Sequence, residues 1–158
     1  SHDLSKQRSD FLAAERALRK NEQDRYRKLK RSLADYPLYP YLRHAELTER
    51  LHELPRVEIR DFLQRYHETP LAWQLRGRWL RLLAAKGLWR DYLADYRPTS
   101  NVTLQCRQLQ ALIRTGQADA PGVAAKRIRT ALEPERIAFA PPATACRSPR
   151  SNRGTPRR

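Results

Sequence analysis

Three glutamates, Glu46, Glu49 and Glu53, are the carboxylates in this sequence whose spacing raises the question of acid–base chemistry. Cleavage of a glycosidic bond uses two carboxyl groups that face each other across a cleft. Residues at positions i, i+3 and i+7 instead follow one side of a single helix, here beside Arg43 and Arg50. The pattern therefore favours ion pairing within a helix, and we assign no catalytic residue to this chain.

The histidines give no metal-ligand pattern. His2, His44, His52 and His67 are not spaced as in H-E-x-x-H, and the sequence contains neither a glycine-rich phosphate loop nor a G-x-S-x-G motif. Surface or structural roles are the better interpretation of all four. We therefore predict no metal site and no cofactor.

Aromatic side chains are the remaining residues that could contact a ligand, because their rings stack on sugars and on bases. Most of them fall on apolar stripes with helical spacing and are predicted to pack in a core. Tyr39 and Trp73 lie off these stripes and are the candidate glycan contacts. The basic run from Arg25 to Arg31 is typical of nucleic-acid or heparin patches. Tyr26 and Leu29 interrupt it at stripe positions, which favours a charged outer helix face.

An internal repeat organises the chain. The segment Leu33–Tyr36 (LADY) recurs as Leu93–Tyr96, and Leu63–Tyr66 (LQRY) lies midway between them. A second pattern, Pro-Leu-x-x-x-Leu-Arg, begins at Pro37 and again at Pro70. Spacings near 30 residues are those of helix pairs in a solenoid. We place the first pattern in the last turn of the second helix of each pair, and the second pattern at the start of the next pair.

The fold class that follows is all-α, a helical-hairpin superhelix or solenoid segment. Thr69 before Pro70 and either Ser100 or Asn101 are predicted to cap helix starts, and Gly87 is predicted to follow a helix end. The inward stripes are expected to include three groups of residues. These are Leu4, Phe11, Ala14 and Leu18; Tyr41, Leu42 and Ala45; and Val102, Cys106, Leu109 and Ile113.

Composition limits the classes of protein. The chain has 158 residues, 40% of them hydrophobic, and a net charge of +15, so a polyanionic partner such as nucleic acid, anionic lipid or cell-wall glycopeptide is favoured. No apolar run is long enough for a membrane span. The sequence contains no Met, which we interpret as loss of a segment ahead of Ser1. Either a signal peptide was cleaved or the sequence was shortened.

The composition changes after residue 119. Residues 1–119 are expected to form the helical domain, which would be partial, and residues 120–158 an irregular, disordered basic tail rich in Pro, Arg and Ala. Three interpretations of the tail are a basic arm for a polyanion, a solvated end, and translation of a GC-rich gene out of frame. The abrupt change favours the last.

The same repeats support a family resemblance. The stretches DYPLYPYLRHAELTERL (Asp35–Leu51), FLQRYHETPLAWQLRGRWLRLLAAKGLWRDYLADY (Phe62–Tyr96) and LQCRQLQALIRTGQ (Leu104–Gln117) resemble the N-terminal superhelical domain of the soluble lytic murein transglycosylases. The resemblance covers about Asp3 to Asp119. It implies a periplasmic enzyme whose separate lysozyme-like domain cleaves peptidoglycan between N-acetylmuramic acid and N-acetylglucosamine, leaving a 1,6-anhydro product.

The resemblance gives this chain no catalytic residue. The family's acid/base is a Glu followed by Ser, and none of the nine glutamates here precedes a Ser. We therefore expect a truncated, inactive fragment whose partner, through the parent enzyme, is peptidoglycan. The alternative is a basic helical-repeat adaptor or RNA-binding module, although nucleic acid is the less favoured partner.

Two cysteines, Cys106 and Cys146, permit one disulfide in an oxidising compartment or two free thiols. The family has a cysteine at the position of Cys106, but its second cysteine matches Cys146 poorly in spacing and flanking residues. The resemblance thus favours Cys106 as a small core residue over a Cys106–Cys146 disulfide.

Overall fold

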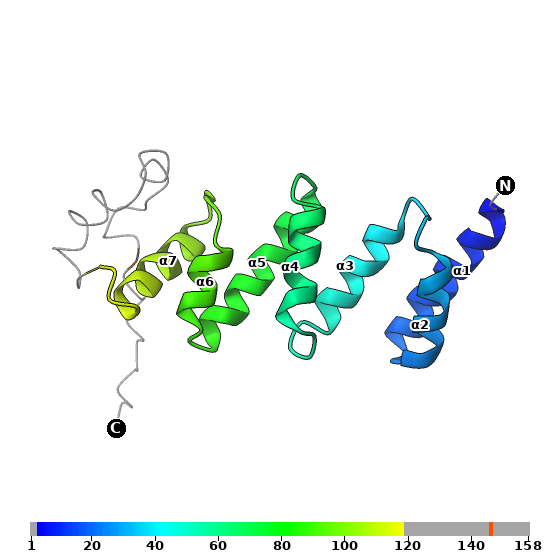
Figure 1. Ribbon diagram of the computed structural model, residues 1–158, viewed down its shortest axis with the longest axis horizontal. Coiled ribbons are helices and arrows are strands. Elements are labelled where there is room, and N and C mark those ends of the chain that lie inside the picture. Colours follow the sequence, from blue (N-terminus) through cyan, green and yellow to red (C-terminus); the bar gives the residue numbers. More distant parts are fainter. Residues whose placement is uncertain (1–2, 119–145, 147–158) are drawn as a thin grey trace, which may run out of the picture. The chain divides into compact units, whose positions relative to one another are not determined.

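The computed structural model describes residues 3–118 and residue 146, and within them it forms seven helices (Figure 1). No strand occurs in that part of the chain, which confirms the all-α prediction. The helices are α1 (Leu4–Arg19), α2 (Gln23–Ser32), α3 (Tyr39–Glu49), α4 (Arg56–Arg65), α5 (Pro70–Ala85), α6 (Trp89–Asp95) and α7 (Val102–Arg114).

Local chemistry sets the helix ends as the sequence predicts. The Thr69 hydroxyl accepts a hydrogen bond of 3.3 Å from the Ala72 N–H, and Asn101 Oδ1 accepts one of 3.1 Å from the Leu104 N–H. Each side chain satisfies a donor that the first helical turn leaves without an intrahelical partner. Gly87 follows α5 with a φ of 69°, a left-handed conformation in which a side chain would be strained.

The repeat falls at the predicted helix ends, with one difference. Leu63 and Leu93 lie in the last turns of α4 and α6, and Tyr66 and Tyr96 are the residues that follow those helices. In the first copy, α2 already ends at Ser32, so Leu33–Tyr36 forms a turn. That turn precedes Pro37, whose fixed geometry disfavours a helical residue before it.

The first compact unit extends through Trp79. Its α1 packs against α2 and α3 around a cluster of buried side chains. The cluster consists of Phe11, Ala14, Ala17, Leu18, Tyr26, Leu33 and Leu42. The prediction for Phe11, Ala14, Leu18 and Leu42 is therefore confirmed. Leu4 and Tyr41 are exposed, contrary to prediction, because each lies in the first turn of its helix and outside the cluster.

The second compact unit begins at Leu80, inside α5. Tyr92 of α6 is fully buried, and its hydroxyl donates a hydrogen bond of 2.6 Å to the Leu104 carbonyl of α7. The predicted inward face of α7 is correct in part, since Leu109 and Ile113 pack against the buried side chains of Leu112 and Ala118. Val102 is exposed, whereas Leu104 and Gln105 are buried. The buried apolar residues Leu104, Ala111 and Leu112 are spaced i, i+7 and i+8, so they share one side of α7.

The predicted basic tail, residues 120–158, lies outside the described residues except for Cys146. The boundary after residue 119 and the out-of-frame origin of the tail therefore stay predictions. The structure joins Cys146 to Cys106 in a disulfide with a Cα–Cα distance of 5.1 Å, the alternative that the resemblance had disfavoured. Among the helices that the structure describes, none has the length and apolarity needed to cross a membrane.

Candidate functional site

A buried carboxylate, Glu46 of α3, lies at the centre of a charged cluster in the first unit. The side chain of Glu46 accepts hydrogen bonds from three residues on two helices. Tyr26 Oη of α2 donates at 2.8 Å and Arg43 Nη1 at 2.6 Å, both to Oε2, while Lys30 Nζ lies 3.2 Å from Oε2. Only 3% of Glu46 is exposed to solvent. The predicted pairing with Arg43 within one helix is thus correct, but it is one part of a network between helices.

The cluster extends from α3 to α4 through Arg43. Arg43 Nη2 donates a hydrogen bond of 2.9 Å to Glu58 Oε2, while Nη1 is bound to Glu46. Arg50 contributes a longer ion pair of 3.9 Å to Glu46 Oε1. A guanidinium can donate to two carboxylates at once because its N–H groups point in fixed, separate directions. Arg43 therefore fixes the position of α4 relative to α3.

The electrostatics keep Glu46 ionised. Burial alone would raise the pKa of Glu46, but Arg43, Tyr26 and Lys30 favour the carboxylate and hold the pKa below its ordinary value. Burial, followed by the charge and hydrogen bond of Glu46, raises the pKa of Tyr26. A carboxylate held in this way is a poor proton donor at neutral pH, so Glu46 does not have the properties of a general acid.

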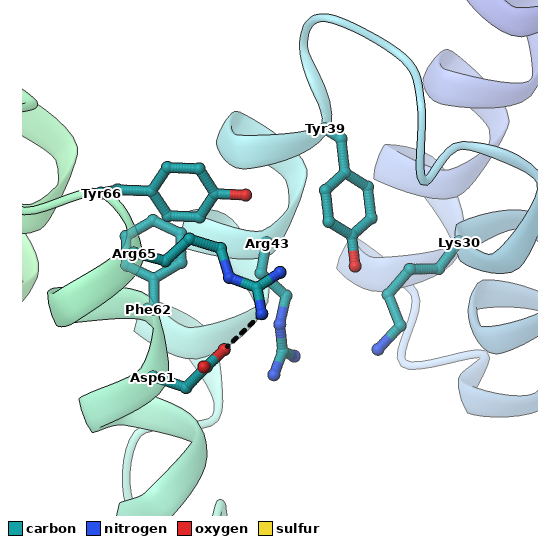
Figure 2. Close-up of a pocket in the computed structure, with 7 residues that line it drawn as sticks. All are labelled: Lys30, Tyr39, Arg43, Asp61, Phe62, Arg65 and Tyr66. Atoms are coloured by element: carbon teal, nitrogen blue, oxygen red, sulfur yellow. Dashed lines mark ion pairs between the residues drawn. The ribbon is translucent and has the colours of Figure 1, made fainter.

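A pocket opens beside this cluster, among α2, α3 and α4. Its volume is about 240 Å³, and its walls are three basic, one acidic and three aromatic side chains. These are Lys30, Arg43, Arg65, Asp61, Tyr39, Phe62 and Tyr66, as Figure 2 shows. In that view the Tyr39 hydroxyl points toward Lys30 and the Tyr66 hydroxyl points toward Tyr39.

The two candidate glycan contacts are therefore not at one site. Tyr39 lines the pocket, whereas Trp73 of α5 is not among its lining residues and is 60% exposed. Their roles as glycan contacts stay predictions. The members of the pocket that sequence reasoning missed are Lys30, Asp61, Arg65 and the pair Phe62–Tyr66. Lys30 belongs to the basic run of α2, and its position four residues after Tyr26, on the same side of the helix, is the signal that could have separated it from its exposed neighbours.

Hydrogen-bond donors outnumber acceptors in the pocket. Burial raises the pKa of Tyr39, so its phenol remains protonated and can donate. The only lining carboxylate, Asp61, lies 3.5 Å from Arg65 Nη2. The Phe62 and Tyr66 rings, with centroids 4.7 Å apart, add an apolar wall. A group with acceptor oxygens and an attached apolar part would complement these walls.

The histidines are scattered. His44 of α3 packs against Phe62 with ring centroids 6.1 Å apart, and burial, followed by the charge of Arg78, lowers its pKa. His52 and His67 are exposed, and His2 lies outside the described residues. Within residues 3–118 and 146, no three His, Cys, Asp or Glu side chains are grouped as a metal site would require.

Comparisons with known proteins relate the chain to one group of enzymes. It is 32% identical over 126 residues to the soluble lytic murein transglycosylase of Escherichia coli K12, covering 79% of this chain and 20% of that protein. The corresponding protein of Salmonella typhimurium LT2 is 31% identical over 124 residues, covering 78% of this chain and 19% of that protein. The chain therefore spans about a fifth of the length of these curated relatives. No family model matches the sequence.

The fold agrees with the sequence comparison. A solved complex of the 70-kDa soluble lytic transglycosylase with bulgecin A matches with a TM-score of 0.67 and 25% identity. The match covers 87% of this chain and 26% of that one. Helical-repeat architecture of the kind predicted from the sequence is thus found in a solved relative.

Proposed function

Since this chain belongs, over its matched four fifths, to the soluble lytic murein transglycosylase family, we propose that it is the N-terminal, non-catalytic superhelical part of such an enzyme. In the parent enzyme it would frame and position peptidoglycan strands. A separate domain would then cleave the bond between N-acetylmuramic acid and N-acetylglucosamine and leave the 1,6-anhydro product.

One observation supports the non-catalytic role above the others. The best-placed buried carboxylate, Glu46, is bound by Tyr26, Lys30 and Arg43 and has a lowered pKa. A glycan-cleaving acid needs the opposite, a carboxyl whose pKa is raised so that it can donate a proton. No Glu–Ser pair occurs in the sequence either. We propose that this chain by itself leaves peptidoglycan uncleaved.

The net charge supports the choice of partner. A chain with a net charge of +15 attracts polyanions, and peptidoglycan carries free carboxylates on its peptides and on those muramic acid residues that lack a peptide. We propose the periplasm as the compartment, which is also where the Cys106–Cys146 disulfide would persist.

Co-sedimentation with purified sacculi tests the proposal. We expect retention of the chain at physiological ionic strength and no release of anhydro-muropeptides. Released anhydro-muropeptides would contradict the non-catalytic role. A parallel measurement with single-stranded RNA tests the alternative of an RNA-binding module. For such a module the logarithm of the binding constant should fall steeply and linearly with the logarithm of the salt concentration. Binding to RNA but not to sacculi would replace the proposal with a nucleic-acid-binding module.

A further inference from the structure

We propose that the pocket formed by Lys30, Tyr39, Arg43, Arg65 and Tyr66 is a binding site for a single carboxylate with a small attached apolar or sugar group. The inference rests on the proposed function for its choice of ligand, since peptidoglycan offers such carboxylates. The two proposals can be tested separately, because the chain could bind no carboxylate in this pocket and still be retained by sacculi.

The first step of the argument is the number of donors. Lys30 donates to Glu46, and Arg43 donates to Glu46 and Glu58, each with part of its donor set, since an ammonium has three N–H groups and a guanidinium has five. Tyr39 and Tyr66 add phenolic O–H groups on the same side (Figure 2). Asp61 is the only acceptor carboxylate in the lining. An incoming carboxylate supplies the acceptor oxygens that this wall lacks.

Arg65 is the lining cation best able to receive the ligand. Its side chain is 64% exposed, and its 3.5 Å approach to Asp61 is longer than a strong charge-assisted hydrogen bond of about 2.8 Å. Little is lost when such a pair separates, because exposed ion pairs contribute little to stability. Arg65 can therefore turn to bind a carboxylate through two N–H groups, with Lys30 and Arg43 held in place behind it by Glu46.

The size and walls of the pocket limit the ligand. A volume of about 240 Å³ accommodates one sugar ring or two small amino acids, but no longer segment of a polymer. The tilted Phe62–Tyr66 pair and the Tyr39 ring provide faces for aliphatic or sugar C–H groups. A bare inorganic ion would leave these faces uncovered.

The pocket is not a general feature of the repeat. Tyr39 of α3 corresponds to Ala72 of α5, since the Pro-Leu-x-x-x-Leu-Arg pattern recurs 33 residues later. Arg65 corresponds to Asp95, 30 residues later in the second pattern. The helix-packing positions Leu63 and Leu93 are kept between the same copies. Arg43, Asp61 and Tyr66 recur as Arg76, Asp91 and Tyr96, so Tyr39 and Arg65 are the lining residues that distinguish this pocket from the next repeat.

Two sources of the carboxylate can be distinguished with small probes. N-acetylmuramic acid presents a sugar carboxylate, and acetyl-alanyl-alanine presents a peptide carboxylate. N-acetylglucosamine and the amide of the dipeptide are their neutral counterparts. Binding of each probe to the full chain is measured by calorimetry. We expect one or both acids to bind, their neutral counterparts to bind at least tenfold more weakly, and the affinity to fall with added salt.

Variants locate the binding. Arg65→Gln and Tyr39→Phe remove one charge and one hydroxyl from the pocket, and each should weaken binding of the acid by about tenfold. Arg27→Gln makes the same charge change at an exposed position of α2 that does not line the pocket, and should leave the affinity unchanged. Three results would overturn the proposal. These are equal binding of the acid and neutral probes, a loss of affinity in Arg27→Gln as large as in the pocket variants, and no binding of either acid. If sacculi still retain the chain in that case, the proposed function stands without this site.

Discussion

The Tyr26 hydroxyl donates a 2.8 Å hydrogen bond to Glu46, and the two residues, one on α2 and one on α3, are both nearly inaccessible to solvent. Through this contact a charged group takes a place in the interior next to the apolar cluster of α1, α2 and α3. A buried carboxylate of this kind is stable only while its donors are present, since an uncompensated buried charge is costly.

Replacement of Glu46 tests this dependence. Glu46→Gln leaves Lys30 and Arg43 without their shared carboxylate, and we expect a loss of about 3 kcal/mol in the free energy of unfolding. Urea unfolding followed by far-ultraviolet circular dichroism measures the change. Glu53→Gln, at an exposed position of the same glutamate row, is the matched control and should change stability by less than about 0.5 kcal/mol. Equal effects would show that Glu46 is an ordinary surface ion pair.

Acid should weaken the fold through the same residue. Because the pKa of Glu46 is lowered from 4.5 in the folded state, its contribution is complete above that value and is lost as the pH falls through the folded pKa. The wild-type chain should therefore lose more stability than Glu46→Gln as the pH falls below 4.5. Parallel curves for the two proteins across that range would contradict the prediction.

His44 should add a separate loss at milder acidity. Burial lowers its pKa below 6.5, so the unfolded chain takes up this proton before the folded chain does. Stability should then fall as the pH drops below 6.5 and continue to fall down to the folded pKa. His44→Gln removes this titration, and its free energy of unfolding should depend less on pH in that range. The measurement is urea unfolding at a series of pH values.

The repeat positions should be important for packing. Leu63→Ala at the end of α4 removes a side chain that is 2% exposed, and we expect a cost of about 3 kcal/mol from the cavity it leaves. Val57→Ala on the same helix is the control, since Val57 is 71% exposed and should tolerate the change within about 0.5 kcal/mol. A small effect at Leu63 would remove the packing role that we assign to the LADY positions.

The disulfide gives a chemical test of the second unit. Cys106 and Cys146 should resist alkylation in the oxidised chain and react after treatment with a reductant. Reduction should lower the free energy of unfolding by about 2–4 kcal/mol, because a link across 40 residues restricts the unfolded chain. Cys106→Ser should reproduce this loss. Free thiols in the oxidised protein would restore the interpretation of Cys106 as a small core residue.

The sequence predicted the helices better than the site. Repeated Leu–Tyr spacings and proline positions are local, so the ends of α4, α5 and α6 followed from them. The partners of Glu46 could not be predicted from the sequence. Tyr26 and Lys30 lie 20 and 16 residues earlier, on a different helix, and no repeating pattern relates them to Glu46. The same limit applies to Tyr92 of α6. Its hydroxyl donates to the Leu104 carbonyl of α7, a partner that no spacing within either helix reveals.

The charged residue Glu46 is not repeated, because the equivalent position 33 residues later is occupied by Trp79. Similar hairpins in a tandem array risk pairing with the wrong neighbour while the chain is still assembling. A helix in the place of α2 that lacked the Tyr26 and Lys30 donors would leave the buried Glu46 with only the cations of its own helix end, Arg43 and Arg50, and the loss of those two donors is costly. We therefore expect Glu46 to favour packing of α3 against α2 over packing against any other helix of the array.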